Sequence, residues 1–140
     1  MSYSQDQNSK IRNQNHSSKP KSLLKEKSYT LSVRIIHFLE KLPRSFSTEV
    51  MSKQLLRSAT SIGANIIEAK ASSSRRDFIN FLTHSLKSAN ETEYWLCLLR
   101  DSKKGDERYV TELLLENNQI CRMLGSSILT LKGKKESERS

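Results

Sequence analysis

The sequence predicts an all-α protein, an antiparallel up-down-up-down four-helix bundle. The 140 residues contain four glycines and two prolines, too few for an all-β protein with many turns. Apolar residues recur every three or four positions through four long segments, which is the spacing of an amphipathic helix. The connections between these segments are short, so consecutive helices are expected to run antiparallel within one domain.

The first helix is predicted to begin at residue 22. A polar segment, 1–21, precedes it, and we expect this segment to be a disordered basic tail. The apolar positions of the helix recur at helical spacing: Leu24, Leu31, Ile35, Phe38 and Leu42. Pro43 ends it, because a proline disfavours helical conformation in the residue before it. The bundle is predicted to span residues 22–131, and residues 132–140 are predicted to form a charged C-terminal tail.

The second helix is predicted over residues 49–71. Ser47 or Thr48 can cap its first turn, where Glu49 also interacts favourably with the helix dipole. Its apolar face comprises Leu55, Leu56, Ala59, Ile62, Gly63, Ile66 and Ile67. At 100° per residue, a polar stripe follows another line of the same helix: Gln54, Ser58, Ser61, Asn65, Glu68 and Ser72. An exposed face normally carries several Lys and Glu residues, so this stripe is either a hydrogen-bonded contact or a surface that lacks lysine by chance.

The third helix is predicted to follow a serine-rich turn and to reach about Lys103. Ser74 and Asp77 resemble a capping box at its start. Its core side gathers Phe78, Leu82, Ser85, Ala89, Thr92, Leu96 and Leu99. A second row lies on the opposite side, which a single bundle does not require: His84, Ser88, Glu91, Trp95 and Leu98. Gly105 is expected to end this helix and Asp106 to cap the next. The core positions of the fourth helix are Leu113, Ile120, Leu124, Ile128 and Leu131.

The formal net charge is +9, and most of the excess lies near the two ends of the chain. Residues 1–28 carry six Lys or Arg and two acidic residues, and residues 132–140 carry four and two. Basic tails suit an anionic partner such as nucleic acid, although solubility alone also explains them. The candidate nucleic-acid-binding residues are Lys70, Arg75, Arg76, Lys103, Lys104, Arg108, Lys132, Lys134 and Lys135.

Residue types suited to catalysis do not occur at catalytic spacings. The three histidines lie far apart, and the sequence contains no HExxH or CxxC pattern. The lone glycine of SIGAN does not make a phosphate-binding loop. Glu68 and Glu91 could face each other, but a di-metal bundle site also needs Glu-x-x-His pairs, which are missing. We therefore predict a non-enzymatic protein with no metal and no cofactor.

Hydropathy and cysteine usage predict a cytoplasmic protein that does not enter a membrane. No apolar run approaches the ~20 residues needed to span a bilayer, and the first residues lack the apolar core of a secretory signal. Cys97 and Cys121 lie among apolar neighbours in helical patterns. This context indicates reduced core cysteines rather than a disulfide.

Three blocks carry a resemblance to a known family: QLLRSATSIGANIIEA, SRRDFINFL and KSANETEYWLCLLRD. In order and spacing they resemble the four-helix bundle proteins encoded in intervening sequences of bacterial 23S ribosomal RNA genes. The resemblance runs from about Leu23 to Leu131 and implies a bacterial, cytoplasmic, ring-like homopentamer. A more distant relative of that family is the accessory protein of diversity-generating retroelements, a basic pentameric barrel that binds nucleic acid and a reverse transcriptase.

With this resemblance, we interpret the polar stripe as a helix–helix contact, within a subunit or between subunits. The candidate contact residues are Ser61, Gly63, Asn65, Glu68, Ser88, Glu91 and Trp95. Two functions are then expected. One is an oligomeric protein that binds RNA or DNA through basic residues with little sequence specificity. The other is a homo-oligomeric scaffold that recruits a protein partner such as a reverse transcriptase. We favour the first.

Overall fold

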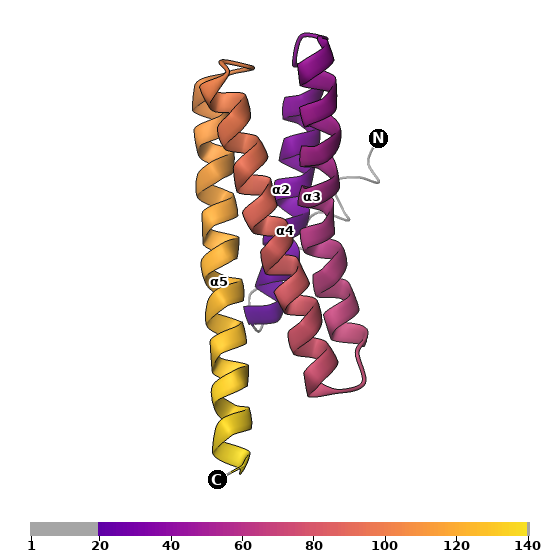
Figure 1. Ribbon diagram of the computed structural model, residues 1–140, viewed down its shortest axis with the longest axis vertical. Helices are drawn as coiled ribbons and strands as arrows, with labels where there is room; N and C mark the ends of the chain where they lie inside the picture. Colours follow the sequence, from indigo (N-terminus) through magenta and orange to yellow (C-terminus); the bar gives the residue numbers. More distant parts are fainter. Residues whose placement is uncertain (1–19, 140) are drawn as a thin grey trace, which may run out of the picture.

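The computed structural model describes residues 20–139, which form four helices and no strand (Figure 1). The helices are α2 (Pro20–Glu40), α3 (Phe46–Ala71), α4 (Arg75–Asp101) and α5 (Glu107–Arg139). Consecutive helices run in opposite directions, and α5 returns to pack against α2. The predicted antiparallel four-helix bundle is therefore confirmed.

The first and last described helices extend beyond the predicted limits of the bundle. α2 begins at Pro20, inside the segment predicted as a tail, and proline is well suited to the first position of a helix. The rest of that predicted tail, residues 1–19, lies outside the described residues. α5 continues to Arg139, so the segment predicted as a charged tail prolongs the last helix. None of the described helices is long and apolar enough to cross a membrane.

The start of α3 differs from the sequence prediction. Ser45 is the N-cap, in place of Ser47 or Thr48, and its hydroxyl accepts a hydrogen bond from the Thr48 N–H at 3.2 Å. The side chain of Thr48 is buried, and its hydroxyl accepts a hydrogen bond from Ser45 Oγ at 2.8 Å. Because Ser45 already satisfies the first turn, the helix begins at Phe46 rather than at Glu49.

Replacing Ser45 with alanine is expected to lower the free energy of unfolding by about 1 kcal/mol, because the Thr48 N–H loses its acceptor. Ser47→Ala is the matched control: Ser47 is exposed, and its expected change is below about 0.5 kcal/mol. Urea unfolding of both variants measures the difference. Equal effects of the two substitutions would contradict the assignment of the cap to Ser45.

The caps predicted for the next two helices are confirmed. Ser74 is the N-cap of α4, and its Oγ accepts a hydrogen bond from the Asp77 N–H at 3.1 Å. Asp106 occupies the same position before α5, and its carboxylate accepts a hydrogen bond from the Arg108 N–H at 2.9 Å. Both helices therefore begin where the sequence signals place them.

The end of α4 is formed by Lys103 and not by Gly105. Lys103 takes the left-handed conformation with φ of 56°. The Lys104 N–H donates to the Leu99 carbonyl at 2.8 Å, and the Lys103 N–H donates to the Arg100 carbonyl at 3.0 Å. These two bonds make a Schellman closure, in which a lysine holds the place usually given to glycine. The prediction for Gly105 was wrong because the cap lies two residues earlier.

The apolar core is formed by one side of each helix. Its largest fully buried side chains are Leu24, Leu31, Ile35, Leu55, Ile62, Ile66, Leu96, Leu99, Val110, Leu113, Ile120 and Leu124. Leu56 and Ile67, which the sequence places on the buried face of α3, are instead 36% and 52% exposed. Both lie beyond the edge of α2. That helix covers α3 at Gly63, where an added Cβ would be 3.6 Å from the Cβ of Ser28.

Five buried polar side chains line the middle of the core: Ser28, Ser58, Ser85, Thr92 and Asn117. Thr92 Oγ1 donates to Ser58 Oγ at 2.9 Å, and Ser85 Oγ donates to the Ile62 carbonyl at 2.8 Å. Both bonds join α3 to α4, while the Asn117 amide joins α5 to α4 by donating to a backbone carbonyl at 2.9 Å. The polar stripe of α3 is thus part of a helix–helix contact at Ser58, where charge would be costly to bury.

Candidate nucleic-acid and assembly surfaces

One end of the bundle gathers basic residues from the α3–α4 turn and from the end of α5 (Figure 1). Lys70 lies in the last turn of α3, and Arg75 and Arg76 open α4. Lys132 and Lys134 lie on α5, whose C-terminal end reaches the same end of the bundle. All five side chains are exposed. We call these five residues the basic end.

Most of the net charge of the described residues lies in the segments at this end. Segments 20–27, 66–79 and 126–139 contain 10 Lys or Arg and five Asp or Glu, a net +5 of the +7 carried by residues 20–139. They comprise the start of α2, the α3–α4 turn and the end of α5, which includes the backbone of Lys135. Two helix N-termini and two C-termini lie at this end, so the helix dipoles largely cancel and the side chains set the potential.

The other predicted basic group lies at the opposite end of the bundle, in and after the α4–α5 turn: Lys103, Lys104 and Arg108. One chain therefore does not bring the two turn clusters together. Acidic residues are interleaved with this group: Asp101, Asp106 and Glu107. Arg100 Nε donates to Asp101 Oδ1 at 2.9 Å, and this hydrogen bond raises the pKa of Arg100. Neighbouring carboxylates thus offset much of the positive charge at this end.

The predicted contact residues of α3 and α4 do not pair as expected within the chain. Among the described residues, no hydrogen bond joins Ser61, Asn65 or Glu68 to Ser88 or Glu91. The Asn65 amide instead donates to the Ser61 carbonyl of its own helix at 2.8 Å. Contacts of these residues with another subunit remain a prediction.

Glu91 does join the two helices, through a residue outside the predicted contact set. Its carboxylate forms an ion pair with Arg57 of α3 and accepts a hydrogen bond from Trp95 Nε1 at 3.3 Å. Trp95 is half-buried against the core, and its ring lies edge-on to Tyr94 with the ring centroids 5.1 Å apart. The side chains of Arg57 and Glu91 are 57% and 36% exposed, so the pair contributes at most about 1 kcal/mol.

The contact between α2 and α5 depends on Arg34. Its guanidinium pairs with Glu112 at 2.8 Å and with Glu116, and it lies 5.1 Å from the centroid of the Tyr109 ring. Burial by itself lowers the pKa of Arg34, but its interactions with Glu112 and Tyr109 raise it above the ordinary value. Arg34 is thus held by α5, which makes it a poor candidate for binding an external anion.

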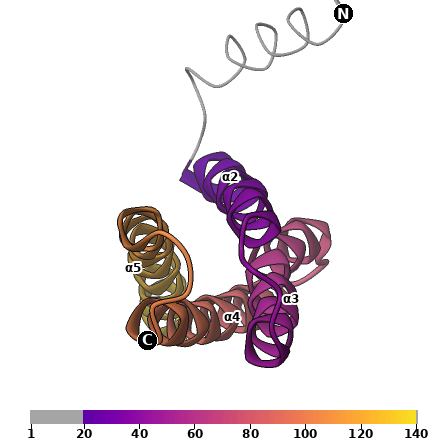
Figure 2. The same cartoon turned by 90° about the horizontal axis from the view of Figure 1, so that it is seen from above.

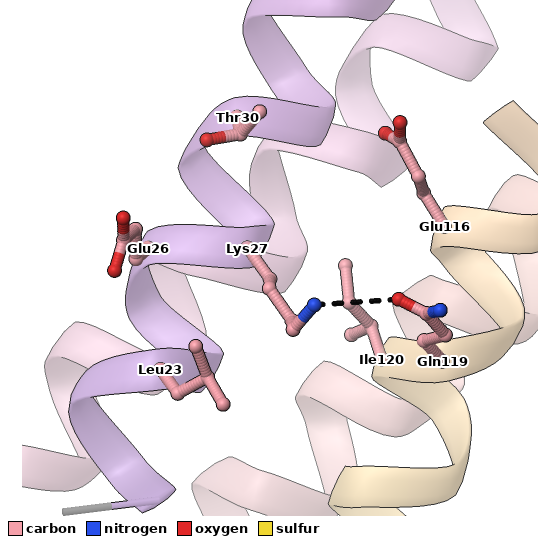
Figure 3. Close-up of a pocket in the computed structure, with 7 residues that line it drawn as sticks. All are labelled: Leu23, Glu26, Lys27, Thr30, Glu116, Gln119 and Ile120. Atoms are coloured by element: carbon pink, nitrogen blue, oxygen red, sulfur yellow. Dashed lines mark hydrogen bonds between the residues drawn. The ribbon is translucent and has the colours of Figure 1, made fainter. Parts of the chain in front are cut away.

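An open pocket of about 360 Å³ lies between the same two helices (Figure 3). Lys27 Nζ donates across it to Gln119 Oε1 at 3.3 Å. The lining mixes polar and aliphatic side chains: Leu23, Glu26, Lys27, Thr30, Glu116, Gln119 and Ile120. In the part of the chain that the structure describes, no group of three or more His, Cys, Asp or Glu residues could hold a metal ion.

Exposed apolar residues lie beside the contact between α2 and α3. Ser32 Oγ donates to the Ala59 carbonyl at 3.3 Å and, with the approach of Ser28 to Gly63, fixes how these helices face each other. At 100° per residue, the outer side of this contact carries four large side chains. They are Tyr29 (72% exposed), Ile36 (37%), Leu56 (36%) and Ile67 (52%). We call these four residues the α2–α3 apolar face.

The fold and these surfaces define the molecule as a small antiparallel four-helix bundle protein. The chain belongs to the 23S rRNA-intervening sequence protein family, whose model matches residues 21–126. This match confirms the family resemblance of the three sequence blocks. It includes Lys70, Arg75 and Arg76 of the basic end, whereas Lys132 and Lys134 lie beyond it.

A solved structure supports the same assignment. It is a crystal structure of a protein with unknown function from the S23 ribosomal protein family of Bacteroides thetaiotaomicron VPI-5482. The two chains are 45% identical and superpose with a TM-score of 0.71, over 79% of the present chain and 98% of the other. No match was found among curated proteins.

Proposed function

We propose that this protein is a non-catalytic, cytoplasmic bacterial protein that binds RNA or DNA through its basic end. The single observation that carries the proposal is the charge distribution: the described segments at one end of the bundle carry a net +5, and the other described residues carry only +2. Lysine and arginine side chains that neutralise phosphates release condensed counterions, and this release drives association with any nucleic acid.

Binding of this kind has little sequence specificity. Sequence is read by side chains that reach base edges in a groove, whereas contacts with phosphates position the protein without reading bases. The basic end presents Lys and Arg side chains from the α3–α4 turn and from the end of α5.

Self-assembly would strengthen this binding. We propose a homopentamer, in line with the family resemblance, and five chains together carry +45. Several basic ends on one particle would contact one nucleic acid together, so the overall affinity would exceed that of a single chain. The protein would act without metal or cofactor.

A second candidate function is a homo-oligomeric scaffold that recruits a protein partner such as a reverse transcriptase. The α2–α3 apolar face supports it, because several large apolar side chains exposed on one face often mark a protein interaction site. In this alternative, the apolar face would hold a neighbouring subunit or the partner, and contacts with nucleic acid would be secondary.

Light scattering of the purified protein, with and without a short duplex RNA or DNA, tests both functions. We expect a particle of about 80 kDa, five times the 16.1 kDa of one chain. When duplex is added at about 50 mM salt, the mass of the particle should increase. At about 200 mM salt this increase in mass should disappear. A pentamer that ignores nucleic acid at low salt would favour the scaffold. A monomer would contradict the oligomeric part of both functions.

A further inference from the structure

The kind of nucleic acid that suits the basic end depends on which side chains accompany its charges. Proteins that bind single strands combine a positive groove with exposed aromatic side chains, on which successive bases stack. Each stacked base contributes about 1–3 kcal/mol, so aromatic residues largely decide whether unpaired bases are favoured. A base-paired duplex keeps its bases stacked inside and offers phosphates on its surface.

Among the described residues at this end of the bundle, no aromatic side chain is exposed. Phe78 and Phe81 are the nearest aromatic residues, and both are half-buried and packed against the core. The large apolar side chains exposed near this end are aliphatic, namely Leu23, Ile67 and Leu129.

The exposed aromatic residues that the structure describes lie elsewhere on the bundle. Phe46, 87% exposed, begins α3 at the opposite end. Tyr94, 58% exposed, is 19 residues along α4 from Arg75, about 28 Å at the rise of a helix. Tyr29 lies on the side of the bundle, within the α2–α3 apolar face. Among the described residues, no exposed aromatic ring therefore lies among the five cations of the basic end.

We infer that the basic end selects base-paired nucleic acid and contacts its phosphates, in preference to single strands. This inference rests on the proposed function. The exposed Arg75 and Arg76 guanidinium groups suit phosphate oxygens well, because their planar donors can bind two oxygens at once. A duplex also presents more phosphates per unit length than one strand does, so the same five cations gain more from it.

Fluorescence anisotropy with two DNA probes tests the inference on the full-length protein. One probe is a hairpin of about 20 base pairs, and the other is an oligothymidine with the same number of phosphates. We expect the hairpin to bind at least about tenfold more tightly, with a slope of log K against log salt near −4.5 for five phosphates. Oligothymidine that binds equally well or better would overturn the inference and leave the proposed function standing. Failure of both probes to bind at low salt would overturn both.

Variants of exposed aromatic residues provide a second test of the inference. Phe46→Ala and Tyr94→Ala remove rings that do not pack in the core, so both variants should fold normally. We expect both to bind the hairpin as the unmodified protein does, whereas Arg76→Ala should weaken binding and reduce the magnitude of the salt slope by about 1. A loss of affinity in either aromatic variant comparable with that of Arg76→Ala would show that bases stack on the protein, which contradicts the inference.

Discussion

Gly105→Ala is expected to lower the free energy of unfolding by about 2–4 kcal/mol. Gly105 has φ of +79°, where a side chain costs about 1–2 kcal/mol. The added Cβ would also lie 2.7 Å from Leu42 Cδ2 and 2.8 Å from two ring atoms of Phe38. The Phe38 ring is buried and stacks on Tyr109, with their ring centroids 5.6 Å apart, so it cannot move aside easily. Overpacking of this kind costs about 1–3 kcal/mol more.

Gly125→Ala is the matched control for this measurement. Gly125 lies inside α5, and an added Cβ there would meet nothing within 4 Å. Alanine is favoured over glycine in a helix interior by up to about 1 kcal/mol, so the control should be neutral or stabilised. Urea unfolding at one fixed protein concentration compares the two variants. Equal stability of Gly105→Ala and the unmodified protein would show that the α4–α5 turn does not pack against α2 as described.

Reversing two charges at the basic end, with Arg75→Glu and Arg76→Glu together, is expected to weaken binding of a DNA hairpin by at least about 100-fold at 0.1 M salt. Each arginine loses a charge-assisted contact worth about 1.5–3 kcal/mol, and each new carboxylate repels phosphate. The magnitude of the salt slope should fall by about 2. Both side chains are exposed, which keeps the effect on folding small. Anisotropy titrations at several salt concentrations measure both quantities.

The same reversal at the opposite end, Lys103→Glu with Lys104→Glu, is the control for position. It changes the total charge by the same amount but acts among the acidic residues of the α4–α5 turn. We expect a decrease of less than about tenfold, since charges beyond a Debye length of about 10 Å are screened at this salt concentration. Equal losses in the two double variants would mean that total charge, rather than the basic end, governs binding.

The two candidate surfaces lie on different parts of the bundle and adjoin only at Ile67, one helical turn from Lys70. The basic end lies at the α3–α4 turn and the end of α5, and the α2–α3 apolar face follows the side formed by α2 and α3 (Figures 1 and 2). Subunits that met through that side would leave the α4 and α5 residues of each basic end open to a ligand. Assembly and nucleic-acid binding could therefore occur in one particle, and variants of each surface can be tested separately.

The sequence by itself determined the fold class, the helix order and most of the core. Helical spacing of apolar residues depends only on the rotation per residue, so it identifies a buried stripe without knowledge of the partner helix. Caps such as Ser74 and Asp106 were also predictable, because a cap acts on its own helix within three residues. The family match is a property of the same local blocks.

Only the tertiary structure decided which side of each helix meets which neighbour. Ser58 reaches Thr92 of α4, Gly63 faces α2, and Glu91 pairs with Arg57. The sequence prediction assigns Ser58, Gly63 and Glu91 to one contact and does not include Arg57 in it. Leu56 and Ile67 recur at the same helical spacing as the core residues of α3, but they lie beyond the edge of α2 and are exposed. The gathering of the basic residues at one end likewise follows from the antiparallel packing of the helices, since charges up to about a hundred residues apart meet only when distant segments are folded together.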